Sequence, residues 1–178
     1  MKKSVLNEIC VKVAKIISKC GTRDPRKICS ALNINVYYHD LHKKLKGYYV
    51  KKFGINNIVL DSNLTEEYEP IILGHELGHS VLHGDSVMTY HEIGIYDSLD
   101  SLEVQAHYFC AELLLSDEQV LSAFEEYDCF EAVAKSLSVP YDLLDFKLQL
   151  MESKNLPTIK DLNYANRNFL KNNMDAYK

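Results

Sequence analysis

The sequence of 178 residues predicts an α+β fold that is mostly helical, with a small sheet of about three strands and a helical C-terminal part. Two observations predict it. Short apolar segments bounded by polar residues follow one another between residues 33 and 63, as expected for strands. Most of the remaining chain places apolar residues at helical spacing, and no internal repeat or low-complexity linker interrupts it.

The N-terminal third is predicted to form two helices and then the sheet. A second, short helix opens at Asp24-Pro25 and runs to about Leu32, since proline is well tolerated in the first helical turn. The first helix is amphipathic, with these apolar residues at helical spacing: Val5, Ile9, Val13, Ile16 and Ile17. Strands are predicted at about residues 33–41, 47–54 and 55–63.

From residue 66 onward the pattern becomes helical. One helix begins near Glu66, accepts Pro70 only in its first turn and ends near Gly84. A loop is predicted over residues 85–98, and the next helix runs from about residue 99 to 115. These elements place two long helices next to each other in the sequence, separated by the loop.

The chain is predicted to divide into a domain of residues 1–116 and a helical subdomain of residues 117–178 packed on it. The second and third helices of this subdomain have the shape of a helix-turn-helix unit over residues 130–149. Helix starts are predicted from capping boxes or close variants and from a proline: Ser116 with Gln119, Asp128 with Glu131, and Pro140.

The composition predicts a cytoplasmic protein without a membrane partner. The five cysteines are widely spaced without a C-x-x-C pair, which disfavours a zinc knuckle or a redox site and is typical of reduced thiols. Glu8, Lys12 and Lys15 interrupt the N-terminal apolar run, which a secretory signal would not tolerate. No stretch approaches the roughly 18 uncharged apolar residues of a spanning helix.

Charge is distributed unevenly along the chain. Residues 64–115 contain ten Asp and Glu but no Lys or Arg, whereas residues 1–63 contain thirteen Lys and Arg against four acids. The same central segment holds five of the seven histidines. Because carboxylates and imidazoles without neighbouring cations favour a bound metal ion, this segment is the predicted location of a metal site.

The central segment contains His75-Glu76-Leu77-Gly78-His79, an H-E-x-x-H motif on a predicted helix. Histidines four residues apart lie about 40° apart around a helix, so both rings can reach one ion. Zinc binds neutral imidazole well, and one Zn²⁺ per chain is predicted. Glu76 is placed to accept a proton from a water molecule that the metal activates. The motif therefore predicts a zinc-dependent endopeptidase with Glu76 as its catalytic base.

Two further features of this helix suit a metal site. Its histidines share one inward-facing stripe with apolar residues: Tyr68, Ile71, Ile72, His75, His79 and Leu82. Burying two imidazoles without partners is costly, and a metal removes that cost. Gly74 and Gly78 each weaken a helix interior by about 1 kcal/mol relative to alanine. We therefore expect a strand or a substrate backbone to approach the helix at these glycines.

A zinc hydrolase needs a third protein ligand, for which Glu103 is the preferred candidate. It borders an apolar stripe on the next helix, formed by Leu102, Ala106, Phe109, Cys110 and Leu113. Packing this stripe on the motif helix aims Glu103 and His107 at the site, so His107 either orients a ligand or is the third ligand itself. His83 has drifted off the ligand face and would cap the helix end or line the cleft. Candidates for stabilising an oxyanion are Tyr90, His91 and Tyr96.

Four segments together resemble the ImmA/IrrE family of metallopeptidases: DPRKICSALNINVYY, INNIVLDSNL, HELGHSVLHGD and LEVQAHYFCAELLLS. They cover about residues 22–117 in order. The resemblance implies a zincin-like domain in which His75, His79 and Glu103 bind zinc and Glu76 is the base. It also implies an anti-repressor, whose substrate is a helix-turn-helix repressor of a prophage or another mobile element.

Direct nucleic-acid binding is not expected, despite the helix-turn-helix shape. The second helix of that unit shows Asp142 and Asp145 against Lys147, and phosphate contacts need several cations. Tyr141 and Phe146 are therefore assigned to the core rather than to base recognition.

A non-catalytic regulator that contains zinc and binds a repressor or another partner is the alternative to an enzyme. A structural zinc site has four protein ligands and does not need Glu76, which favours the enzyme. In the enzyme, an extended substrate is expected to pair with an edge of the small sheet near residues 47–60.

Overall fold

The computed structural model describes residues 1–42, 44–84, 89–90 and 101–156. Its helices are α1 (Lys3–Cys20), α2 (Pro25–Ala31), α3 (Glu69–His83), α4 (Ser101–Leu114), α5 (Asp117–Glu126), α6 (Phe130–Ser136) and α7 (Tyr141–Ser153). Its strands are β1 (Asn35–His39), β2 (Gly47–Lys52), β3 (Ile55–Asp61) and β4 (Thr89–Tyr90). The predicted α+β class, mostly helical with a small sheet, is confirmed.

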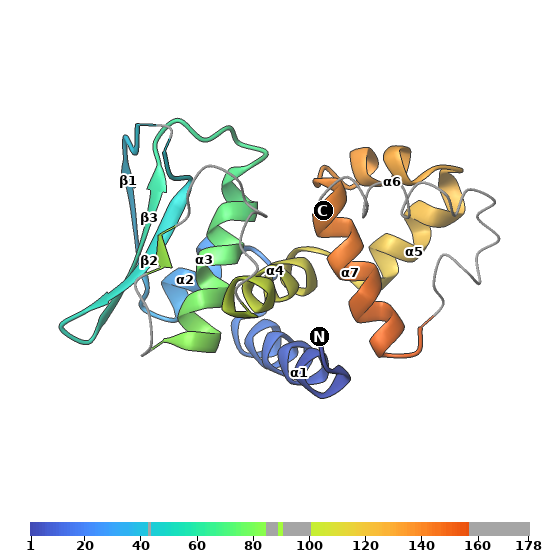
Figure 1. Ribbon diagram of the computed structural model, residues 1–178, viewed down its shortest axis with the longest axis horizontal. Coiled ribbons are helices and arrows are strands. Elements are labelled where there is room, and N and C mark those ends of the chain that lie inside the picture. Colours follow the sequence, from blue (N-terminus) through green and yellow to red (C-terminus); the bar gives the residue numbers. More distant parts are fainter. Residues whose placement is uncertain (43, 85–88, 91–100, 157–178) are drawn as a thin grey trace.

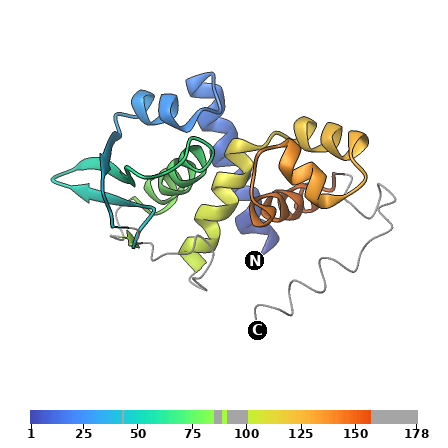
Figure 2. The same cartoon turned by 90° about the horizontal axis from the view of Figure 1, so that it is seen from above.

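The elements follow one another along the long axis of the molecule. The sheet lies at one end with α2 and α3 against one of its faces, and α5, α6 and α7 lie at the other end (Figure 1). Helices α1 and α4 lie between them, and Figure 2 shows the same order from above. Helix α4 therefore connects the sheet-bearing part of the molecule to its C-terminal helices.

The sheet has the strand order β1-β3-β2-β4. Strand β1 runs parallel to β3, while β2 forms an antiparallel hairpin with β3. The three predicted strands are present, but the sheet has a fourth: β4 pairs with β2 through Tyr48–Tyr90 and Tyr49–Thr89. The prediction of a loop over residues 85–98 was therefore wrong at Thr89 and Tyr90, because two paired residues are too short to leave an alternating pattern in the sequence. The rest of that predicted loop lies outside the described residues.

Most helix boundaries follow local signals. The predicted capping box at Ser116 is present: its Oγ accepts from the Gln119 amide at 3.1 Å, and the Gln119 side chain accepts from the Ser116 amide at 3.1 Å. The next predicted cap was wrong by one residue, since Cys129 rather than Asp128 precedes α6. Cys129 has the extended backbone of an N-cap, and its sulfur accepts from the Ala132 amide.

Two clusters of buried apolar residues form the core. One joins the sheet to α1, α2, α3 and α4, and the other joins α5 to α6. Helix α7 contributes to both, with Leu143 and Leu150 in the first cluster and Leu144, Leu148 and Met151 in the second. No helix among these described elements has the length and apolar composition needed to span a bilayer.

Two tyrosines that the sequence assigned to buried positions are exposed. Tyr68 is 46% exposed, because α3 starts at Glu69 and Tyr68 belongs to the preceding turn rather than to the inward-facing stripe. Tyr141 is 42% exposed at the first turn of α7, so its assignment to the core was also wrong. Phe146, by contrast, is partly buried and packs against the first core cluster.

Candidate metal centre

Helices α3 and α4 pack closely because small side chains line their contact. A Cβ atom at Gly78 would lie 3.2 Å from the backbone of Ala106 and 3.1 Å from the Phe109 ring. A Cβ atom at Gly74 would lie 3.2 Å from the sulfur of Cys110. The element that approaches the two glycines is therefore a neighbouring helix, and the expectation of a strand or a substrate backbone was wrong.

This close approach brings the first turn of α4 to the motif histidines. Glu103 Oε2 lies 3.3 Å from His75 Nε2 and 3.3 Å from His79 Nε2, and the two nitrogens are 3.1 Å apart. All three side chains are buried. They form a group of possible metal ligands whose donor atoms lie within 4.8 Å of one another.

The donor set and its spacing fit zinc. Two imidazole nitrogens and one carboxylate form a donor set typical of catalytic zinc sites. Ligands about 2.1 Å from a tetrahedral ion lie about 3.4 Å from one another. The three observed separations, 3.1 to 3.3 Å, are close to that spacing. Glu103 also lies in the first turn of α4, where the helix dipole stabilises its negative charge.

Glu76 is fully buried beside this group. Burial raises the pKa of its carboxyl well above the ordinary value, and the negative charge of Glu103 raises it further. The backbone of Tyr49 in β2 acts in the opposite direction and lowers the pKa. Glu76 therefore has a high proton affinity within a site that combines two histidines with a second carboxylate.

Two more histidines contact the group. The His107 ring is buried, and its centroid lies 4.3 Å from that of His75. His83, the last residue of α3, places its Nδ1 3.3 Å from Nδ1 of His79. Burial lowers the pKa of His83, and the neighbouring His79 lowers it further, so a neutral imidazole is favoured. Neither residue belongs to the group of three donors.

The loop candidates are placed only in part. Tyr90 lies in β4, and its main chain pairs with that of Tyr48. The proposed oxyanion roles of His91 and Tyr96 lie outside the described residues.

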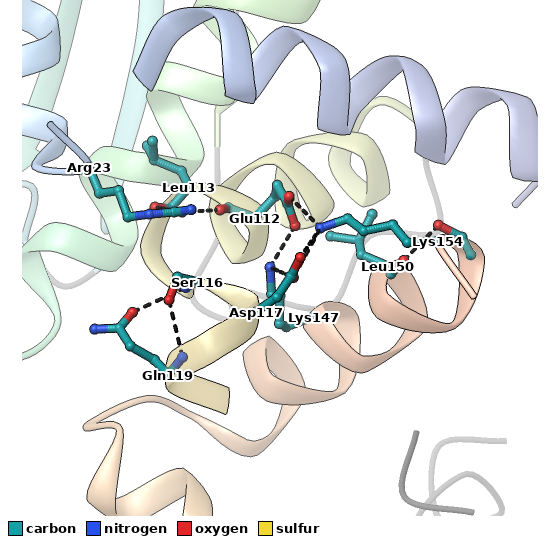
Figure 3. A network of polar contacts seen from close by, with 10 residues as sticks. Arg23, Glu112, Leu113, Ser116, Asp117, Gln119, Lys147, Leu150 and Lys154 are labelled. Carbon is teal, nitrogen blue, oxygen red and sulfur yellow. Dashed lines mark hydrogen bonds and ion pairs between the residues drawn. The ribbon is translucent and has the colours of Figure 1, made fainter. Parts of the chain in front are cut away.

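A second buried polar cluster lies at the other end of α4. Lys147 Nζ lies 2.7 Å from Glu112 Oε2 and 2.6 Å from Asp117 Oδ1. Lys154 Nζ lies 2.6 Å from Glu112 and 3.0 Å from Asp117 (Figure 3). Arg23 donates to the backbone carbonyls of Glu112 and Leu113, which end α4. The cluster thus joins α4 to α5 and α7.

Sequence reasoning missed this cluster and counted Lys147 among the cations of a recognition helix. The Lys147 side chain is fully buried, so it cannot contact a phosphate. The available signal was its position among the leucines of α7, where a lysine needs a carboxylate partner.

Comparisons with known proteins identify the family. A model of the peptidase M78 family, described as the IrrE N-terminal-like domain, matches residues 29–149. The chain is 33% identical over 144 residues to "Uncharacterized immunity region protein 2" of Bacillus phage phi105, covering 80% of this chain and 90% of the relative. It is 28% identical over 145 residues to metallopeptidase ImmA of Bacillus subtilis (strain 168), covering 80% of this chain and 85% of the relative.

The match extends beyond the four segments that showed the resemblance, since it includes α5, α6 and most of α7. It also spans both ends of α4, which carry the metal-ligand group and the ion cluster. Because the match covers more than half of its length, the chain belongs to the IrrE N-terminal-like family of peptidases.

Proposed function

We propose that this protein is a zinc-dependent endopeptidase in which His75, His79 and Glu103 hold the metal and Glu76 is the general base. The observation that carries the proposal is the buried group of two imidazoles and one carboxylate with the spacing of tetrahedral zinc ligands. Three protein ligands leave one position for water or substrate, as in catalytic rather than structural zinc sites. Membership of a peptidase family supports the same chemistry.

In this proposal the metal and Glu76 have separate roles in hydrolysis. A bound Zn²⁺ supplies Lewis acidity, which acidifies a water molecule and polarises the scissile carbonyl. Glu76 accepts the proton of the attacking water and delivers it to the leaving amine. Glu76 is suited by position to both steps, because it directly follows the proposed ligand His75 on α3 and is buried beside the group of possible ligands.

His83 and His107 hold the ligand rings. His79 directs Nε2 at the metal group, so its own proton belongs on Nδ1, from which it can donate to Nδ1 of a neutral His83. His107 packs its ring against His75 and restricts that ring from the side of α4. In the proposal these two histidines orient the ligands, and Glu103 rather than His107 completes the donor set.

We further propose that the substrate is a regulatory protein of the cytoplasm, a helix-turn-helix repressor of a prophage or another mobile element. One relative bears the name of a phage immunity region protein, and another that of the metallopeptidase ImmA, which supports this setting. The expected pairing of an extended substrate with a sheet edge near residues 47–60 is not proposed, because β2 and β3 are inner strands of the sheet and the described edges are β1 and β4. Direct contact with nucleic acid is not proposed, since Lys147 is buried.

Metal content and cleavage, measured on the same preparations, test the proposal. The wild type and Glu76→Gln should each bind about one zinc per chain, and only the wild type should cut a quenched-fluorescent peptide library. His75→Ala and Glu103→Ala should lose the metal, whereas His107→Ala should keep it with reduced affinity. Cleavage by Glu76→Gln at the wild-type rate would reject the base assignment.

Absence of stoichiometric zinc, after dialysis of the wild type against the metal, would favour the alternative function. The protein would then be a regulator that acts by binding a repressor or another partner. If His107→Ala lost zinc and Glu103→Ala kept it, His107 would be the third ligand and Glu103 would not. Each outcome thus separates one part of the proposal from the others.

A further inference from the structure

Helix α7 reaches the metal centre through two aromatic contacts. The ring of Phe146 on α7 stacks on His107 of α4, with centroids 5.3 Å apart and planes inclined by 16°. The His107 ring in turn lies against His75, with centroids 4.3 Å apart. The three rings form a continuous contact from the C-terminal helix to a proposed ligand.

The Phe146 ring is held on a second side. Tyr108, the neighbour of His107 on α4, contacts Phe146 edge to face at a centroid distance of 4.8 Å. The Tyr108 hydroxyl also donates to the side chain of Gln149 on α7. Stacking and edge contacts of this kind prefer defined ring orientations. Phe146 can therefore restrict the orientation of the His107 ring, in addition to its apolar packing in the core.

The ion cluster fixes the register of α7 on α4. Lys147 directly follows Phe146, and its ammonium contacts Glu112 of α4 and Asp117 of α5. Because Lys147 is fully buried, sliding α7 along α4 would separate a charge pair inside the protein, which is strongly unfavourable. The pair thus sets the height at which the Phe146 ring meets His107.

We propose that Phe146 is a positioning residue of the metal centre, which holds the His107 ring so that His107 keeps His75 in its metal-binding orientation. The inference rests on the proposed metal site. It adds that the C-terminal helices contribute to that site through α7. Outer partners of metal ligands commonly change metal affinity by about 10- to 100-fold when they are replaced.

The test compares Phe146→Leu with the matched control Phe130→Leu in the full chain. Phe130 also lies in the C-terminal helices and is partly buried, but its described ring contacts are with Phe124 and Tyr141. The zinc dissociation constant, measured by competition with a chelator of known affinity, should rise about 10-fold for Phe146→Leu. For Phe130→Leu it should stay within about twofold of the wild-type value.

A double-mutant cycle with His107→Ala tests the route of the effect. If Phe146 acts through His107, adding Phe146→Leu to His107→Ala should leave the dissociation constant unchanged within about twofold. Additive effects of the two changes would overturn the proposal. Phe146→Tyr, which keeps the stacking ring, should retain wild-type affinity, and an affinity as weak as that of Phe146→Leu would also overturn it.

Folding and metal binding are separated by two further measurements. Melting temperatures confirm that each compared variant is folded, and Phe146→Met replaces Phe146→Leu if the latter does not fold. Failure of the wild type to bind zinc would reject the proposed function itself. Zinc binding by a folded Phe146→Leu as tight as that of Phe130→Leu would reject only the role of Phe146.

Discussion

The two ends of α4 each carry a buried polar cluster, and they differ in how their charges are balanced. At the C-terminal end, two carboxylates, Glu112 and Asp117, meet the ammonium groups of Lys147 and Lys154. At the N-terminal end, Glu76 and Glu103 meet histidines in a segment whose sequence contains no Lys or Arg. The first cluster balances its own charge, whereas the second, in the proposed function, would receive its balancing cation from solution.

This difference explains why only one cluster is a candidate functional site. A buried charge must be paired, and lysines that belong to the chain do so permanently. Neutral imidazoles are good metal ligands but carry no charge to offset two carboxylates. Buried titratable residues therefore indicate a ligand only when the chain does not itself supply the balancing charge. Four substitutions or conditions can test this comparison.

The largest change in stability is expected for Lys147→Met. It removes a fully buried ammonium and leaves two carboxylates to share Lys154, which should cost about 3–5 kcal/mol of unfolding free energy. Urea unfolding followed by circular dichroism measures it. The exposed Lys135→Met is the control and should change stability by less than about 0.5 kcal/mol. Equal losses in both variants would show that the buried pairing contributes little.

Zinc that binds at the N-terminal end of α4 should raise the unfolding free energy of the protein, by somewhat less than Lys147→Met lowers it. At a free concentration 100 times its dissociation constant, the metal should add about 2.7 kcal/mol to the unfolding free energy. The gain should disappear in His79→Ala and persist in Lys154→Ala, whose change lies in the other cluster. Thermal unfolding with zinc and with a chelator measures it, and an equal gain in His79→Ala would contradict the site.

The packing that assembles the metal group can be tested at its glycines. Gly78→Ala should destabilise the protein by about 1–3 kcal/mol and weaken zinc binding, because its Cβ meets the backbone of Ala106. In Gly74→Ala, the added Cβ would come closest to the side chain of Cys110, which can move. The alanine also favours the helix by about 1 kcal/mol relative to glycine, so this variant should lose less stability than Gly78→Ala. Chemical unfolding and zinc titration of both variants compare them. Equal effects would mean that backbone contact at Gly78 is unimportant.

The smallest effect is expected for Asp117→Asn, because Asp117 retains part of its exposure to water. Burial would raise the pKa of Asp117, but hydrogen bonds and charges from Lys147 and Lys154 outweigh burial and lower it. Its stabilisation is therefore complete above the unfolded value of about 3.9 and is lost as the pH falls through the lower folded pKa. Unfolding free energies of both proteins should differ at pH 7 and converge in acid, and a constant difference would contradict this assignment.

The parts of the site that follow from local spacing could be predicted from the sequence. Helical periodicity places His75 and His79 on one face, and the stripe beside Glu103 indicated which side of the next helix packs there. Capping chemistry is similarly local, as Ser116 shows. These features depend on residues within two or three turns of one another.

Features that depend on distant partners could not be predicted in the same way. The stripe that contains Ala106 was expected to pack on the motif helix, but spacing within one helix does not show that its backbone meets Gly78. Lys147 looks like an exposed cation until Glu112 and Asp117 are placed beside it. Strand β4 depends on pairing with Tyr48 and Tyr49 rather than on its own two residues. Tertiary contact, not local preference, decides such cases.

The contribution of α7 to both core clusters has a consequence for the order of events during synthesis. All three proposed ligands and Glu76 have been synthesised by residue 103, but Phe146 follows about forty residues later. At a rate of about 5–20 residues per second, the metal-binding helices precede their final neighbour by roughly 2–8 seconds. A nascent or truncated chain can therefore present the whole motif before the helix that stacks against His107 exists. In the proposed function, full metal affinity would then appear only after α7 has been synthesised and has packed on α4.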